Sequence, residues 1–186
     1  MYRTPSKLSR RRLLAWSLAG AAAARPAWSQ ASVPSAVVLD FDLLDDHPNT
    51  AGDNQAQLGA RLRRAHVQLQ QELQAQGLYR IVPLENAQAL LDKLRNEQEY
   101  MHRCEDCARQ IGRQLDTDYA ITGWVQKVSE LILNLNIEVH DVRRGRVVLS
   151  KSVDMRGNND QSWERAVRFL VNDMAQKRQG NPKYGM

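Results

Sequence analysis

Three strands are predicted within DYAITGWVQKVSELILNLNIEVHDVRRGRVVLSKSVDM, residues 118–155, where apolar and polar side chains alternate. Alternation with a period of two places the apolar side chains on one face of a strand. After a first strand at 118–128, the second has Leu131, Leu133, Leu135, Ile137 and Val139 on one face and Asn134, Asn136, Glu138 and His140 on the other. Beyond a turn at 143–145, the third has Val147, Leu149, Val153 and Met155 on one face. The pattern predicts an antiparallel meander with one covered face and one face toward water or a partner.

Helices with one apolar stripe precede and follow this meander. The first is predicted around Leu58, Leu62, Ala65, Leu69 and Leu73, and the last around Trp163, Ala166, Val167, Leu170 and Met174, with Asn159 or Asp160 as its N-cap. Strands are predicted at 37–41 and 78–83, and helices at 84–100 and 104–115. The order β-α-β-α-α-β-β-β-α predicts an α/β (α+β) fold, a two-layer sandwich in which a mixed sheet with a C-terminal antiparallel meander packs on helices.

The first 31 residues have the features of a cleaved export signal. Six Lys or Arg residues and no acidic residue surround an apolar run at 13–24. SRRRLL (9–14) resembles a twin-arginine signal, with general secretion as the alternative, and a run of 12 residues is short of the ~20 that a membrane anchor needs. We therefore expect a signal at 1–31, a single α/β domain at 34–178 and a flexible tail at 179–186, in a periplasmic protein without a membrane span after cleavage.

The basic charge of the chain belongs to this signal. The chain has 26 Lys and Arg against 21 Asp and Glu, and six of the basic residues but none of the acidic ones lie in residues 1–31. The other residues are nearly neutral in net charge, so they lack the excess of basic groups that binding a phosphate backbone requires. A nucleic-acid partner is therefore not expected. Two local clusters are interpreted as solvated faces or turns: Arg61, Arg63 and Arg64, and Arg143, Arg144 and Arg146.

Three segments resemble an uncharacterised family of bacterial exported proteins with a domain of unknown function: VVLDFDLLD (37–45), residues 104–142 and MRGNNDQSWERAVRFLV (155–171). The early strand, IGRQLDTDYAITGWV (111–125) and the hairpin are more distantly similar to the amino-terminal domain of TolB and the related domain of curli-type secretion lipoproteins. The resemblance implies a small α/β domain that binds other envelope proteins. Such families are also associated with periplasmic alcohol oxidation by quinoprotein dehydrogenases.

Cys104 and Cys107 are the only cysteines of the chain, and a disulfide is the favoured interpretation. Thiols of an exported protein meet an oxidising environment, and the Cα atoms of residues i and i+3 of a helix lie about 5 Å apart, within disulfide range. Thiol–disulfide chemistry stays open, although Glu105 and Asp106 disfavour a thiolate. Zinc also stays open, although His102 and the cysteines supply fewer ligands than a closed site needs.

The segment MRGNNDQSW (155–163) is the main candidate binding site. Arg156 can hold a carboxylate through two hydrogen bonds, and a sharp turn at Gly157 brings polar side chains to a helix N-terminus. The candidate binding residues are Arg156, Asn158, Asn159, Asp160 and Trp163, together with Asn136 on the polar face of the meander. The structural alternative is a helix cap, an ion pair of Arg156 and a core tryptophan.

A second candidate is the acidic segment that follows the first strand. Asp40, Asp42, Asp45, Asp46 and Asp53, with Asn49 and Asn54, supply oxygen ligands for a cation, but they lack the spacing of a calcium loop and are interpreted as turn and cap residues. Nucleophile-elbow, metalloprotease and phosphate-loop motifs are absent from the sequence.

We therefore expect a non-enzymatic periplasmic binding or adaptor protein, without cofactor or metal, that acts on another envelope component. One alternative is an accessory of a quinoprotein-dehydrogenase-type redox system in which the CxxC pair cycles between dithiol and disulfide. The other is a protein that binds a small ligand or a cation.

Mass spectrometry of the exported protein without reductant tests the signal and the disulfide in one measurement. We expect cleavage near Ser29 or Ala31, because small residues at 27 and 29, or at 29 and 31, suit the signal peptidase. We also expect a mass two hydrogen atoms below that of the dithiol form. Retention of the first 31 residues, or two free thiols, would contradict these expectations.

Overall fold

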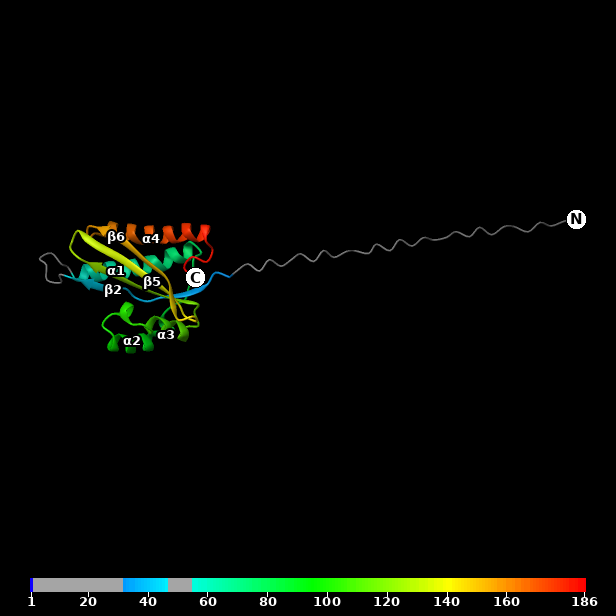
Figure 1. The fold of residues 1–186 in the computed structure, drawn as a ribbon, viewed down its shortest axis with the longest axis horizontal. Helices are drawn as coiled ribbons and strands as arrows, with labels where there is room; N and C mark the ends of the chain where they lie inside the picture. Colours follow the sequence, from blue (N-terminus) through cyan, green and yellow to red (C-terminus); the bar gives the residue numbers. More distant parts are fainter. Residues whose placement is uncertain (2–31, 47–54) are drawn as a thin grey trace. The chain divides into compact units, whose positions relative to one another are not determined.

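A computed structural model of the protein describes residue 1 and residues 32–46 and 55–186. Apart from residue 1, the predicted export signal lies outside the described residues, as do Asn49, Asp53 and Asn54 of the acidic segment. The strands are β1 (Ser35–Val38), β2 (Asp42–Asp45), β3 (Arg80–Ile81), β4 (Tyr119–Lys127), β5 (Ile132–Asp141) and β6 (Arg146–Arg156). The helices are α1 (Gln55–Ala75), α2 (Gln88–Glu97), α3 (Cys107–Gln114) and α4 (Asp160–Gly180) (Figure 1).

The strands form one mixed sheet in the order β3-β1-β4-β5-β6, and β2 also pairs with β4. β1 and β2 run parallel to successive parts of β4, whereas the pairs β4–β5 and β5–β6 are antiparallel. The predicted mixed sheet with a C-terminal meander is therefore confirmed. β2 is not predicted by the sequence pattern, because its two adjacent leucines stand between aspartates and do not alternate with polar residues.

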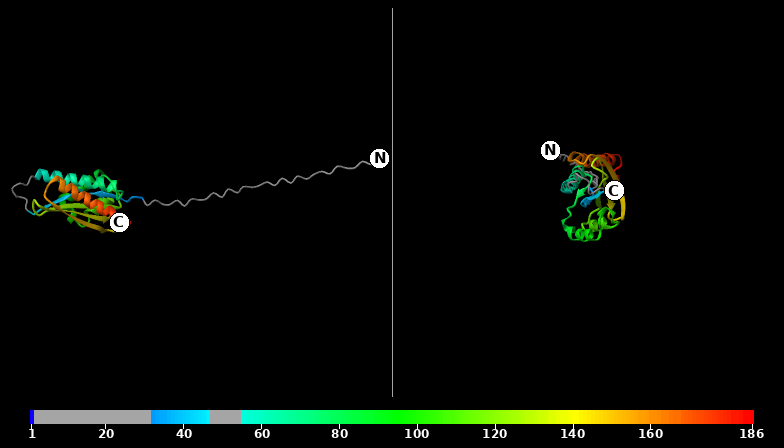
Figure 2. Two further views of the ribbon diagram at one scale, coloured as in Figure 1. Left: turned by 90° about the horizontal axis from the view of Figure 1, so that it is seen from above. Right: turned by 90° about the vertical axis from the view of Figure 1, so that its left-hand side faces the viewer.

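Helices cover both faces of the sheet (Figures 1 and 2). α1 and α4 share one apolar core with the sheet, and α2 and α3 share a second one. The predicted α/β class is confirmed. The sheet lies between two helical layers, whereas the sequence predicted one sheet packed on one layer of helices. The origin of the second helical layer lies in β1, which is buried throughout: Val38 belongs to the first core and Val37 to the second. A continuous apolar run of this kind is typical of a parallel strand buried on both faces.

The meander buries its apolar face under α1 and α4, with two exceptions. Leu133, Leu135, Ile137 and Val139 are all buried there, as predicted. Leu131 is exposed because it precedes β5, in the connection from β4. Val147 is also exposed, because a register shift at Val139/His140 moves it out of the alternation that Leu149 and Met155 follow. The assignment of Leu131 and Val147 to the covered face is therefore wrong.

Residues 181–186, predicted as part of a flexible tail, turn back onto the domain after α4. The Tyr79 hydroxyl donates a hydrogen bond to the Gly185 carbonyl, and Arg178 Nε donates to the Tyr184 carbonyl at 2.9 Å. Burial raises the pKa of Tyr79 to about 12, in spite of the Arg178 guanidinium, which lies over its ring at 4.6 Å. The phenol therefore stays protonated and can donate this bond at any physiological pH.

No helix in residues 32–46 and 55–186 combines the length and the hydropathy that crossing a membrane requires.

Gly123 in β4 offers a test of this packing. A Cβ atom at this position would lie 2.3 Å from Cε1 of Phe41, so the aromatic ring fills the space that a side chain would need. We expect Gly123→Ala to lower the free energy of unfolding by about 1–3 kcal/mol through overpacking, measured by chemical denaturation. The same substitution in a Phe41→Ala background should cost much less. Equal costs in both backgrounds would show that the ring does not set the constraint.

Candidate functional site

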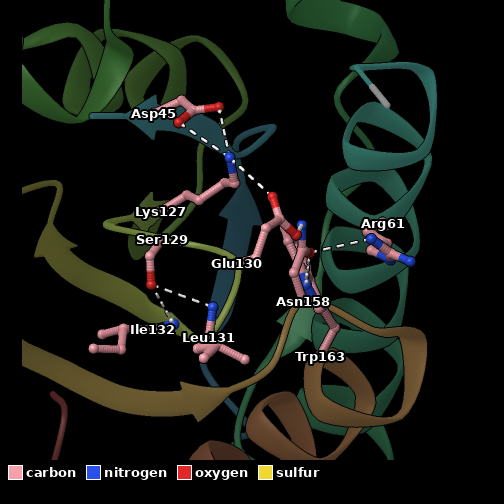
Figure 3. A network of polar contacts seen from close by, with 9 residues as sticks. All are labelled: Asp45, Arg61, Lys127, Ser129, Glu130, Leu131, Ile132, Asn158 and Trp163. Carbon is pink, nitrogen blue, oxygen red and sulfur yellow. Dashed lines mark hydrogen bonds and ion pairs between the residues drawn. The ribbon is translucent and has the colours of Figure 1, made fainter. Parts of the chain in front are cut away.

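Two segments far apart in the sequence meet at one end of the sheet. The first is the hairpin tip, residues 128–132, which connects β4 to β5 and includes the first residue of β5. The second is the β6–α4 turn, residues 157–159. Figure 3 shows that side chains from α1 and β2 join them in one polar network. The network and the residues on its surface form the candidate site.

The backbone of the hairpin tip is held by hydrogen bonds from within and from the neighbouring turn. The Ser129 hydroxyl accepts from the amides of Leu131 and Ile132, each at 3.2 Å. The amide of Gly157 donates to the Leu131 carbonyl at 3.0 Å, and that of Asn158 donates to the Glu130 carbonyl at 2.8 Å. Gly157 has a φ of +84°, which a residue with a side chain rarely adopts. These hydrogen bonds from the β6–α4 turn therefore hold the backbone of the hairpin tip in one conformation.

A buried lysine anchors the base of the tip. Lys127 is 1% exposed, and its Nζ lies 3.3 Å from Asp45 Oδ2, at the end of β2, and 3.1 Å from Glu130 Oε1. Burying an ammonium group is costly unless carboxylates surround it. The triad therefore ties the tip to both the central strand and β2.

The Asn158 side chain connects the turn to three other elements. Its Nδ2 donates to Glu130 Oε2 at 3.0 Å, and its Oδ1 accepts from Trp163 Nε1 and Arg61 Nη1, both at 3.1 Å. Arg61 Nε also donates to Asp160 Oδ1 at 2.8 Å. This hydrogen bond, together with the charges of Arg64 and Arg61, lowers the pKa of the Asp160 carboxyl, which therefore stays ionised. Arg61, interpreted from the sequence as part of a solvated face, is a structural residue.

The surface of the hairpin tip is apolar. Leu131 is 72% exposed and Ile132 is 51% exposed, and Val128 beside them is exposed as well. Single exposed apolar residues are common, but three within five residues of a fixed loop form a patch. Sequence reasoning missed this patch, because Leu131 is apolar and lies two residues before Leu133, so it fits the alternation of apolar and polar residues in β5. A usable signal was the adjacent pair Leu131–Ile132, which no strand can bury on a single face.

The structure brings some of the predicted binding residues together and separates others. Asn158, Asp160 and Trp163 join the network described above. Asn159 caps α4 by accepting from the Ser162 amide at 3.0 Å. Arg156 is exposed at the end of β6, opposite Ile132. Asn136 lies four residues along β5 from Ile132, about 13 Å away, and donates to the Asn134 carbonyl. Asn136 is therefore not part of this site.

The aspartates of the described part of the acidic segment point to different partners. Asp40 pairs with Arg95, Asp42 with His102, Asp45 with Lys127, and Asp46 accepts from Gln126. No group of three or more His, Cys, Asp or Glu side chains in residues 32–46 and 55–186 has an arrangement that could hold a metal ion.

Cys104 and Cys107 lie at disulfide distance in a separate region, with Cα atoms 5.5 Å apart. Nδ1 of the neighbouring His102 donates to Asp42 Oδ2 at 2.7 Å, and the imidazole ring stacks on Trp124 with ring centroids 4.5 Å apart. Cys104 directly follows a 3-10 turn at Met101–Arg103, and Cys107 is the first residue of α3. The pair therefore links the end of this turn to the start of α3, on the side of the sheet that α2 and α3 cover. It therefore fixes the start of α3 and does not contribute to the hairpin tip.

Replacement of Lys127 by methionine tests the anchor of the tip. The substitution keeps most of the buried side-chain volume but removes the ammonium group that lies 3.3 Å from the Asp45 carboxylate. We expect a loss of about 3 kcal/mol in the free energy of unfolding, because one charge of a buried pair remains without its counterion. Lys127→Met with Asp45→Asn should recover part of this loss. A K127M variant as stable as the wild type would show that the triad does not hold the tip.

Several solved structures are similar to this chain. The LpoB C-terminal domain from Salmonella enterica is 13% identical with a TM-score of 0.44, covering 69% of this chain and 87% of that chain. The PelC dodecamer from Paraburkholderia phytofirmans is 16% identical with a TM-score of 0.41, covering 77% and 83%. TolB from Acinetobacter baumannii is 9% identical with a TM-score of 0.42, covering 82% of this chain and 30% of that chain.

None of the curated proteins compared with this chain matches its sequence. A family model does match, over residues 34–174, and its description is DUF3280, protein of unknown function (DUF2380). Of the elements that the structure describes, these residues include all strands, all helices except the end of α4, and the whole hairpin-tip network. The chain therefore belongs to the DUF3280 family of proteins of unknown function.

Proposed function

We propose that the protein is a non-enzymatic binding or adaptor protein of the periplasm, which docks on another envelope component through the hairpin tip. The observation that carries this proposal is the combination of exposure and rigidity. Leu131 and Ile132 face water on a loop whose backbone groups are fixed by Ser129 and by the amides of Gly157 and Asn158.

A rigid apolar tip suits binding for a thermodynamic reason. Burying a leucine or isoleucine side chain in a partner contributes about 1.5–3 kcal/mol each. Ordering a loop during association would cancel part of this gain, but the tip is already ordered by the β6–α4 turn. Apolar anchors within a polar rim are the usual composition of an interface. Here Glu130, Arg156 and Asn158 supply that rim.

The polar groups of the network support binding rather than chemistry. Asn158 and Arg61 hold one another, and Lys127 is enclosed between Asp45 and Glu130. A general base or nucleophile needs access to a substrate atom, and the 1% exposure of Lys127 does not provide it. The charged groups therefore shape and fix the tip.

Two features of the chain favour the periplasm as the compartment. The basic, acid-free start of the sequence with its apolar run favours export. The cysteine pair at disulfide distance suits an oxidising compartment.

Site-specific photocrosslinking in a bacterium that exports the protein tests the proposal. A photoreactive amino acid at position 131 should give a reproducible adduct with one envelope component, and Ile132→Ser should remove this adduct because the partner loses its second anchor. The matched control is position 147, where Val147 is also exposed, at 45%, but lies at the start of β6, the opposite end of this strand from the β6–α4 turn. Thermal unfolding of Ile132→Ser should differ little from that of the wild type, because an exposed side chain contributes little to stability.

No adduct at position 131, or the same adducts at 131 and 147, would contradict docking through the tip. An adduct that persists in the Ile132→Ser protein would mean that the apolar patch does not select the partner.

A further inference from the structure

A groove beside the hairpin tip runs between α1 and α4. The two helices lie side by side in the same direction, because Arg61 contacts Asp160, Gln68 contacts Glu164, and Gln76 contacts Asn172. The groove has a volume of about 600 Å³ and involves residues 61–72 of α1 and 160–168 of α4. Its size lies within the range of ligand-binding clefts.

Four arginines line this groove, with fewer carboxylates between them. The arginines are Arg61, Arg63, Arg64 and Arg168, and the carboxylates are Glu72, Asp160 and Glu164. Arg61 and Arg64 share the single carboxylate of Asp160, each at 2.8 Å. Arg168 pairs with Glu164, one turn before it on the same helix. The groove therefore offers more cationic groups than its own carboxylates neutralise.

These arginines differ in exposure and in partners, and the difference shows which of them supports the fold and which can contact a ligand. Arg61 is 14% exposed and holds both Asn158 and Asp160, so it belongs to the scaffold. Arg64 is 59% exposed, and Asp160 keeps Arg61 when Arg64 moves away. The pair of Arg168 with Glu164 is an exposed i,i+4 pair, which contributes little to stability because water screens both charges. Arg64 and Arg168 can therefore exchange their present partners for a carboxylate of a ligand.

The groove also contains an apolar element between its charges. Val67 lines the groove one turn after Arg63 and Arg64, and it is one of the exposed large apolar residues. Phosphate backbones have no apolar group to place there, and the near-neutral charge of residues 32–186 does not attract a long polyanion. A polypeptide that alternates acidic and apolar residues matches both features.

We infer that this groove binds an acidic segment of a partner protein, with carboxylates on Arg64 and Arg168 and an apolar side chain on Val67. The inference is independent of docking through the hairpin tip, because Val67 and Arg168 take no part in the network around Lys127 and Asn158, and Arg64 touches it only through Asp160. Two surfaces at neighbouring positions would let one domain hold two segments of one partner, or two partners.

Fluorescence anisotropy with the labelled peptide EELEELEE and with labelled hexaglutamate tests the inference on the mature protein. Arg64→Gln with Arg168→Gln should weaken binding of both peptides at least fivefold. The matched control is Arg143→Gln with Arg146→Gln, which removes the same charge from exposed positions in the β5–β6 turn and at the start of β6 and should change binding less than twofold. Val67→Ser should weaken binding of EELEELEE about threefold or more and leave hexaglutamate unchanged.

Equal weakening by the groove and control variants would overturn the inference, because net charge alone would then explain binding. So would the absence of binding by the wild type, or tighter binding of labelled oligo-dT with the same dependence on Arg64 and Arg168. Circular dichroism and thermal unfolding confirm that each variant is folded. Leu131→Ser with Ile132→Ser should bind the peptides as the wild type does, so that failure of the groove and failure of the hairpin tip are distinguishable.

Discussion

The pairing of β4 on both of its edges is the constraint on which the rest of this structure depends. One edge receives β1 and β2 in parallel, and the other receives β5 antiparallel along its whole length. Because its edges are occupied in this way, β4 sets the position of every other strand except β3 and β6, which attach to β1 and β5. The same strand ends in Lys127, so the position of β4 also determines where the hairpin tip begins.

The buried charges at the end of β4 explain why the tip can be both apolar and ordered. A loop that exposes leucine and isoleucine would gain from collapsing onto the domain surface. The triad of Asp45, Lys127 and Glu130 and the amides of the β6–α4 turn hold its backbone in place instead. Exposure of apolar groups is thus maintained by electrostatic and hydrogen-bond contacts beneath them, which is an arrangement suited to a preorganised binding surface.

Arg61 connects the two surfaces to which we assign binding. Its guanidinium contacts Asn158 in the hairpin-tip network and Asp160 at the mouth of the α1–α4 groove. Arg61 and the start of α4 therefore connect the two surfaces by direct contacts. The cysteine pair lies outside this connection, and its position at the start of α3 favours a structural role over one in partner recognition.

The sequence by itself determined the helices at both ends of the meander, the alternation in β5, an N-cap of the last helix at Asn159 or Asp160, and the proximity of Cys104 and Cys107, because each depends on residues a few positions apart. It did not determine β2, the second helical layer or the exposure of Leu131 and Val147. These depend on backbone pairing with β4, on burial of β1 from two sides and on a register shift between β5 and β6. The role of Asn158 depends on Arg61, 97 positions away, and on Glu130, 28 positions away. Only the tertiary structure brings such groups within hydrogen-bond distance, because local periodicity carries no information about which distant side chains will meet.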